Sequence, residues 1–285
     1  MKTLSVKSYA KINLSLSVIS CRKDGYHELD SIMLPLEFHD SMILSKLKKA
    51  VDNYVTIDDY TVNAFNHNLA TFAIERMANL YHFDDKFRIF IHKVIPLQAG
   101  LGGGSSNAAF TMLSVNKMLK LNIPKDELAK VGLSLGADVP YFFENVPARV
   151  NGIGEKITPI SIKNDYFVLL VKPSQGCSTK EVFSKFEISK NKTQYNIDNV
   201  VKALETGDDD LLASSIGNSL EDVAIQLVPE IQVIKDYLKS RGLKIVLMSG
   251  SGSTVFALSR NKKLLKEIQL ELEDKYFVEV TRILR

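Results

Sequence analysis

The sequence is poor in cysteine and in long apolar runs, and each shortage excludes a class of protein. Cys21 and Cys177 are the only two cysteines in 285 residues. They lie far apart, so we expect two free thiols in a reducing cytoplasm rather than a disulfide framework or a metal site. No segment approaches the roughly 18 uninterrupted apolar residues that a membrane helix requires. Lysines interrupt the first residues, which therefore lack the apolar run of a signal peptide.

The net charge is also small: the sequence has 36 basic and 33 acidic residues, which gives +3. A dedicated nucleic-acid binder usually has a stronger basic footprint, so we expect neither a nucleic-acid nor a membrane partner. The apolar fraction of 45% is ordinary for a globular protein. We expect two packed domains, 1–160 and 161–285, in a monomer or a weak homodimer.

Periodicity in the sequence predicts a mixture of strands and helices. Apolar residues alternate with polar ones from Ile12 to Val18, the pattern of a half-buried strand. A turn is predicted at 22–26, and Pro35 points to an edge or an irregularity in the strand that follows. Further strands are predicted at 27–38, 40–47, 53–58, 86–95, 166–171, 244–249 and 254–258. Helices are predicted after Asn68, after a glycine-rich loop, after Pro124 and through most of the second half, which gives an α+β fold class.

The glycine-rich stretch "PLQAGLGGGSSNAAF" (Pro96–Phe110) lies between a predicted strand and a predicted helix. Helix N-termini present unpaired N–H groups and a positive dipole end, and glycines let backbone approach an anion. Ser105, Ser106 and Asn107 would add side-chain donors at the mouth of the loop. Ser105 stands where a Walker loop needs lysine and where a Rossmann loop needs glycine. A phosphate cradle of another kind and a tight strand-to-helix turn both remain open.

Other polar residues have two interpretations each. Lys11 and Asn13 share one strand face, which either faces solvent or serves a site. Tyr26 and His27 follow a turn and would suit a planar ligand, or they are simply exposed. Asp138 lies in an apolar run and needs a partner, either as the N-cap of a short turn or as a general base. The second glycine–serine loop, 250–253, is either a β-turn or part of a site.

In this order, "AKINL", "DGYH", "PLQAGLGGGSSNAA", "GADVP" and "SGSGSTVF" resemble the GHMP kinase superfamily over nearly the whole chain. The resemblance implies a two-domain GHMP kinase fold of α+β class, with the active site in the interdomain cleft. The first, second and fourth segments are similar to those of one branch of this superfamily. The resemblance implies that the protein, like the kinases of that branch, uses ATP and Mg²⁺ to phosphorylate the 2-hydroxyl of 4-diphosphocytidyl-2-C-methyl-D-erythritol in non-mevalonate isoprenoid biosynthesis.

The resemblance also implies roles for residues. Asp138 would accept the proton of the substrate hydroxyl, and Lys11 would orient Asp138 and stabilise charge on the reacting oxygens. The cytidyl-diphosphate substrate would contact Asn13, Tyr26, His27, Thr179 and Phe183. No protein ligand for Mg²⁺ is assigned. ATP would be bound by Asn68, Leu69, Lys93, Pro96, Leu97, Gln98, Ala99, Gly100, Leu101, Gly102, Gly103, Gly104, Ser105 and Ser106.

Two alternatives remain. A GHMP kinase of another specificity, such as a mevalonate-pathway or homoserine kinase, would explain the glycine-rich loop but not "DGYH" beside "AKINL". A catalytically silent GHMP-fold binding protein would be expected to lose Lys11 or Asp138, and this sequence has both.

Overall fold

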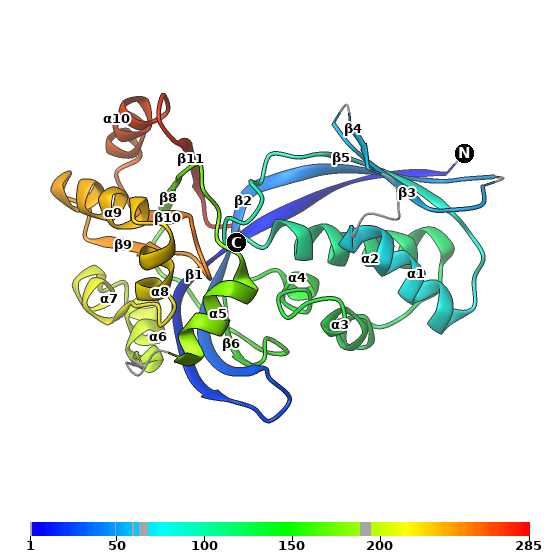
Figure 1. Cartoon of the computed structure of the whole chain (residues 1–285), viewed down its shortest axis with the longest axis horizontal. Coiled ribbons are helices and arrows are strands. Elements are labelled where there is room, and N and C mark those ends of the chain that lie inside the picture. The colour runs from blue at the N-terminus through cyan, green and yellow to red at the C-terminus, as the bar shows by residue number, and fades with distance from the viewer. Residues whose placement is uncertain (1, 49, 59, 63–67, 189–194) are drawn as a thin grey trace. The chain divides into compact units, whose positions relative to one another are not determined.

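A computed structural model describes residues 2–48, 50–58, 60–62, 68–188 and 195–285 (Figure 1). The chain divides into two compact units. Unit 1 comprises 1–10, 38–96 and 102–145, and unit 2 comprises 11–37, 97–101 and 146–285. The units interleave along the chain, and the glycine-rich loop contributes residues to both. The single domain boundary near residue 160 stays a prediction.

The chain opens with two long strands, β1 (Thr3–Cys21) and β2 (His27–Lys46), which pair with each other. The predicted turn joins them: the N–H of Arg22 donates to the carbonyl of Tyr26 over 2.7 Å, and Gly25 has a φ of +85°. The strands predicted at 27–38 and 40–47 are one strand. Pro35 lies between the stretch of β2 that pairs with β6 and the stretch that pairs with β5, and a proline has no N–H for a ladder bond.

In unit 1 the strands follow the order β4-β3-β5-β2, where β3 is Tyr54–Ile57, β4 is Tyr60–Val62 and β5 is Phe87–His92. β5 runs antiparallel to β2 and parallel to β3. The strand predicted at 86–95 is confirmed as β5, in which the alternate residues Phe87, Ile89 and Ile91 are buried. The helices are α1 (Leu69–Tyr81), α2 (Gly103–Leu119), α3 (Lys125–Leu133) and α4 (Tyr141–Glu144). α1 and α2 pack against each other on one side of these strands (Figure 1).

Helix α1 begins where the sequence predicts, because the side chain of Asn68 caps it. Oδ1 of Asn68 accepts the N–H of Ala70 over 2.8 Å. Ala73, Met77 and Leu80 fall on one apolar face of this helix; the first two are buried, but Leu80 is 44% exposed. The buried face therefore ends before the last turn of the helix.

In unit 2, β2 pairs with β6 (Ala148–Gly152), which pairs with β7 (Lys156–Pro159). A second sheet is antiparallel, with the order β11-β8-β10-β9. Its strands are β8 (Phe167–Lys172), β9 (Ile245–Met248), β10 (Val255–Ser259) and β11 (Phe277–Arg282). The helices are α5 (Thr179–Ile188), α6 (Ile197–Thr206), α7 (Asp209–Ser215), α8 (Glu221–Leu227), α9 (Glu230–Ser240) and α10 (Lys262–Leu272).

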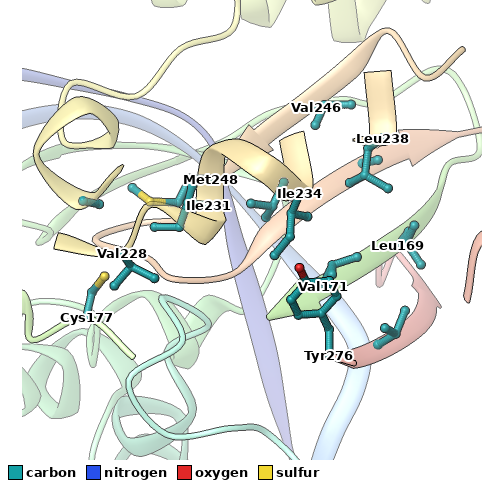
Figure 2. Close-up of a cluster of buried hydrophobic side chains, with 14 of the residues drawn as sticks. Leu169, Val171, Cys177, Val228, Ile231, Ile234, Leu238, Val246, Met248 and Tyr276 are labelled. Atoms are coloured by element: carbon teal, nitrogen blue, oxygen red, sulfur yellow. The ribbon is translucent and has the colours of Figure 1, made fainter. Parts of the chain in front are cut away.

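The core of unit 2 is one buried cluster that includes side chains of α9 and of this second sheet. Ile231, Ile234 and Leu238 come from one face of α9, and Leu169 and Val171 of β8 belong to the same cluster (Figure 2). Burying each such side chain contributes about 1.5–3 kcal/mol. No helix in the described ranges combines the length and the apolarity that crossing a bilayer would require.

The two cysteines are free thiols, as the sequence predicts. Cys21 is exposed, whereas Cys177 lies in the core of unit 2. Burial raises the pKa of the Cys177 thiol, and the nearby Glu181 acts in the same direction.

The expectation of a half-buried first strand is wrong, because the polar face of β1 is buried as well. Asn13, Ser15 and Ser17 have at most 1% of their surface exposed. The hydroxyl of Ser15 donates to the carbonyl of Gly217 over 3.0 Å, and the N–H of Tyr195 donates to the hydroxyl of Ser17 over 3.1 Å. Chain segments distant in sequence therefore cover a face that alternation alone assigns to solvent.

Candidate active site

The glycine-rich loop enters α2 as the sequence predicts. Gly102 is the N-cap residue of α2 and has a φ of +71°. The N–H of Ser106 bonds the carbonyl of Gly102 over 2.9 Å. The N–H groups of Gly103, Gly104 and Ser105 precede this bond and have no acceptor within the helix. With no acidic residue in its first turn, this helix end is suited to an anion.

Within unit 2, Gly100 lies directly against the second glycine–serine loop. A Cβ at Gly100 would stand 2.0 Å from the carbonyl oxygen of Ser249 and 3.2 Å from the nitrogen of Gly252. The hydroxyl of Ser249 also donates to the carbonyl of Gly100 over 2.9 Å. The N–H of Lys11 donates to the carbonyl of Leu101 over 3.0 Å. Residue 100 therefore has to be glycine for steric reasons as well as for its positive φ of +73°.

Two buried polar side chains that could not be identified from the sequence bind the second glycine–serine loop and the strand before it. Asn218 donates through Nδ2 to the carbonyls of Met248 and Gly250, over 2.9 and 2.8 Å. Glu221 accepts the N–H of Met248 over 2.9 Å and pairs with Lys235 over 2.5 Å. Neither residue lies in a recognisable motif, so no local signal identified them.

Lys11 and Asn13 are brought together, as their shared strand face predicts. The ammonium of Lys11 donates to Oδ1 of Asn13 over 2.5 Å, and Nδ2 of Asn13 donates to Ser31 over 2.9 Å. A Cβ at Gly250 would lie 3.2 Å from Oδ1 of Asn13 and 3.4 Å from Nζ of Lys11. Lys11 is only 3% exposed, so the interpretation of this face as solvated is wrong. The two side chains instead face the second glycine–serine loop.

The residues expected to bind the cytidyl group all belong to unit 2. The rings of His27 and Phe183 have centroids 4.8 Å apart and an interplanar angle of 36°. Tyr26, next to them in sequence, is 54% exposed. Thr179, at the start of α5, exchanges a hydrogen bond of 2.9 Å with the hydroxyl of Ser251. This places Thr179 at the second glycine–serine loop and His27 beside Phe183.

In unit 1, the first turn of α2 lies close to the side chains of Lys93 and Leu69. A Cβ at Gly103 would lie 2.9 Å from Nζ of Lys93, and a Cβ at Gly104 would lie 3.7 Å from the Cδ1 atom of Leu69. Lys93 also pairs with the fully buried Asp40 over 2.6 Å. Burial lowers the pKa of Lys93, and Asp40 opposes that shift. Asp40 is another residue that the sequence analysis missed.

The expectation that the side chains of Ser106 and Asn107 lie at the mouth of the loop is wrong. Both are buried in unit 1. The hydroxyl of Ser8 donates to that of Ser106 over 2.8 Å. Nδ2 of Asn107 donates to Ser8 over 2.8 Å and to Asp40 over 3.0 Å. These side chains fix α2 to its neighbours, whereas Ser105 is half-buried.

Asp138 lies half-buried on a turn beside the start of α2. The N–H of Val139 donates to the carbonyl of Gly136 over 3.0 Å, and a Cβ at Gly136 would lie 3.7 Å from Oγ of Ser105. Burial raises the pKa of Tyr141, and the charge of Asp138 adds to that shift. The N-cap position of α4 is occupied by Pro140, so Asp138 stands two residues before it.

The predicted catalytic pair belongs to different units, Lys11 to unit 2 and Asp138 to unit 1. Their joint role stays a prediction. In the part of the chain that the structure covers, no three His, Cys, Asp or Glu side chains gather in a way that could hold a metal ion.

Comparison with known proteins agrees with this geometry. The family model of the GHMP kinases N terminal domain matches residues 68–145, and that of the GHMP kinases C terminal domain matches residues 200–278. A 4-diphosphocytidyl-2-C-methyl-D-erythritol kinase of Lachnoclostridium phytofermentans is 38% identical over 265 residues, which cover 92% of this chain and 90% of the relative. The chain belongs to the GHMP kinase family. As a GHMP kinase it has ATP as a substrate.

Solved structures confirm the two-domain GHMP kinase fold and its α+β class. The crystal structure of a 4-(cytidine 5'-diphospho)-2C-methyl-D-erythritol kinase superposes with a TM-score of 0.81 at 27% identity, covering 98% of this chain and 99% of the other. A homoserine kinase from Cytophaga hutchinsonii gives a TM-score of 0.78 at 17% identity, covering 99% and 95%. The second likeness concerns the fold alone.

Proposed function

We propose that this GHMP kinase transfers the γ-phosphoryl group of ATP to the 2-hydroxyl of 4-diphosphocytidyl-2-C-methyl-D-erythritol, a step of non-mevalonate isoprenoid biosynthesis. One observation carries the substrate: the 38% identity to a kinase of that name extends over 92% of the chain. We expect the enzyme to act in the cytoplasm as a monomer or a weak homodimer, without a nucleic-acid or membrane partner.

We assign the phosphates of ATP to the N-terminus of α2. The N–H groups of Gly103, Gly104 and Ser105 and the ammonium of Lys93 are donors at that end. Such preorganised donors stabilise charge on the transferring phosphoryl group, which has a loose transition state. We assign the nucleoside part of ATP to Asn68 and Leu69, at the start of α1.

The cytidyl group is assigned to unit 2. His27 and Phe183 form an aromatic pair with rings 4.8 Å apart, and Tyr26 offers an exposed ring beside them. Aromatic rings bind a pyrimidine by offset stacking, and the imidazole can hydrogen-bond its edge. Thr179 and Asn13, both close to the second glycine–serine loop, are assigned to the remainder of the substrate.

For the chemical step we propose that Asp138 accepts the proton of the substrate hydroxyl and that Lys11 orients it and stabilises the developing charge. A positioned general base contributes roughly 10²–10⁴ in rate. The half-buried position of Asp138 beside the start of α2 and the buried position of Lys11 beside the second glycine–serine loop support these roles.

Mg²⁺ fits this donor set as a partner of the nucleotide rather than as a resident ion. N–H groups and an ammonium dominate the start of α2, and these groups bind anions. Mg²⁺ is ordinarily held by substrate phosphates, waters and one or two carboxylates. It would neutralise charge on the phosphates, and we assign no side chain to it.

An ATP-consumption assay that offers diphosphocytidyl methylerythritol, mevalonate and homoserine separately tests the proposal. We expect turnover with the first acceptor alone. Turnover with either of the others, and none with the first, would refute the cytidyl specificity. Absence of turnover with all three, despite ATP binding, would favour the catalytically silent binding protein.

A further inference from the structure

Asp40 is a fully buried carboxylate of β2 at the centre of a polar cluster in unit 1. Its Oδ1 accepts the backbone N–H groups of Val94 and Ile95, over 2.9 and 2.8 Å. Its Oδ2 accepts Nζ of Lys93 over 2.6 Å and Nδ2 of Asn107 over 3.0 Å. A buried carboxylate is costly unless it is paired and hydrogen-bonded, and these four bonds meet that requirement.

The two oxygens have separate partners. Oδ1 fixes the backbone that leaves β5 and leads into the glycine-rich loop. Oδ2 joins the side chain of Lys93 to Asn107 on α2. One carboxylate therefore fixes both the approach to the loop and the helix that follows it.

Lys93 brings a positive charge to the start of α2, where a Cβ at Gly103 would come within 2.9 Å of its Nζ. The ammonium has three donors, and two of them bond Asp40 and the carbonyl of Ile95, which is 2.8 Å away. Burial lowers the pKa of Lys93, whereas the charges of Asp40 and Asp58 raise it. Asp40 thus favours the charged form of a lysine whose side chain is only 12% exposed.

We propose that Asp40 is a positioning residue for the nucleotide: it holds the ammonium of Lys93 against the first turn of α2, where that ammonium binds ATP. The inference rests on the proposed function, because it takes this helix end as the phosphate site. Asp40 does not itself contact the nucleotide. It acts through Lys93 and through the backbone before the loop.

The variant Asp40→Asn separates the role of Oδ1, which binds the backbone before the loop, from the role of Oδ2, which binds Lys93 and Asn107. Asparagine keeps one carbonyl oxygen for the N–H groups of Val94 and Ile95, but places an amide donor toward Lys93 and Asn107. We expect the Kd for ATP, measured by calorimetry without acceptor, to rise at least about tenfold, the loss of a charge-assisted bond. The KM for ATP should rise in parallel, while the KM for the cytidyl substrate stays unchanged. A Kd for ATP within about twofold of the unaltered chain would overturn the proposal.

A double-mutant cycle with Lys93→Met asks whether Asp40 acts through Lys93. In the Lys93→Met background, Asp40→Asn should change the Kd for ATP by less than about twofold. An undiminished, additive loss would overturn the proposal. If Asp40→Asn alone fails to fold, the double variant, which leaves no unpaired buried ammonium, can still overturn the proposal, because a weaker Kd for ATP than that of Lys93→Met would show an effect of Asp40 that does not pass through Lys93.

A matched control is the pair of Lys46 and Asp85 in the same unit, with a distance of 2.6 Å. Asp85→Asn should leave the Kd for ATP unchanged. The outcomes also separate the two proposals. An unaltered chain that binds ATP but does not phosphorylate the cytidyl substrate refutes the proposed substrate and leaves the Asp40 test intact. ATP binding that is insensitive to Asp40→Asn refutes the positioning role alone.

Discussion

Ser249 contacts Gly100 through both its backbone and its side chain: its carbonyl oxygen fills the space of a Cβ at residue 100, and its hydroxyl donates to the carbonyl of Gly100 over 2.9 Å. The two glycine-rich segments of unit 2 are therefore fitted to each other. A change at one of them displaces the other.

Gly100→Ala should be strongly destabilising. Its Cβ would lie 2.0 Å from a backbone oxygen, and its φ of +73° adds roughly 1–2 kcal/mol of strain. Gly242→Ala is the matched control, because Gly242 has a φ of +82° and a Cβ added there would meet nothing within 4 Å. Urea unfolding should show a clearly larger loss for Gly100→Ala. Equal losses would mean that backbone strain, rather than the clash, decides the cost.

Asp138→Asn should reduce turnover by about 10²–10⁴, because the amide cannot accept the substrate proton. ATP binding should change little, since we assign the phosphates to backbone N–H groups and Lys93. Steady-state kinetics and a calorimetric Kd for ATP together check this prediction. A near-normal rate would remove Asp138 from the mechanism.

Tyr26→Ala should raise the KM for the cytidyl substrate much more than the KM for ATP. Tyr26 is 54% exposed, so the folded state should tolerate the truncation. Tyr26→Phe keeps the ring and should retain the original KM if stacking is the main contribution. Equal effects of Tyr26→Ala on both substrates would contradict the assignment of the pyrimidine site.

Glu221→Gln should cost about 3–5 kcal/mol of unfolding free energy, because it leaves the buried ammonium of Lys235 without its carboxylate. The two side chains are only 12% and 10% exposed. Asp210→Asn is the control: it breaks the exposed pair with Lys244 and should not change stability measurably. Similar urea midpoints for the two variants would show that the Glu221 pair is no stronger than a surface pair.

Cys177 should resist alkylation in the folded protein. Burial raises the pKa of its thiol, so less thiolate is present at pH 8 than in the unfolded chain. Cys21 is exposed and should react with iodoacetamide first, as mass spectrometry of the peptides would show. In denaturant the two rates should become similar. Rapid labelling of Cys177 without denaturant would indicate that its part of the core opens.

Local sequence patterns predicted the helices and strands whose pattern of apolar and polar residues matches their pattern of burial. The strand predicted at 86–95, the glycines after it and the helix predicted after them all lie within a short segment, and the structure confirms the order of strand, loop and helix. Local patterns left Lys11 and Asp138 with two interpretations each, and only the resemblance to known kinases gave them a joint catalytic role.

Partners distant in sequence explain what was missed. The polar face of β1 is buried because Gly217 and Tyr195 bond it, from 202 and 178 residues away in the sequence. In the sequence Asp40 is one of four acidic residues of β2, and only the placement of Lys93, Ile95 and Asn107 around it sets it apart. Long-range contacts of this kind leave no periodicity in the sequence.

The long strand β2 restricts the lengths of insertion that the family can accept. Its stretch Leu29–Met33 pairs with β6 and its stretch Ser41–Lys46 pairs with β5, with Pro35 between them. Successive side chains point to opposite faces, so one added residue between the stretches would invert one set of faces relative to the other. Two added residues would preserve both. Relatives of this chain should therefore differ in length here by even numbers.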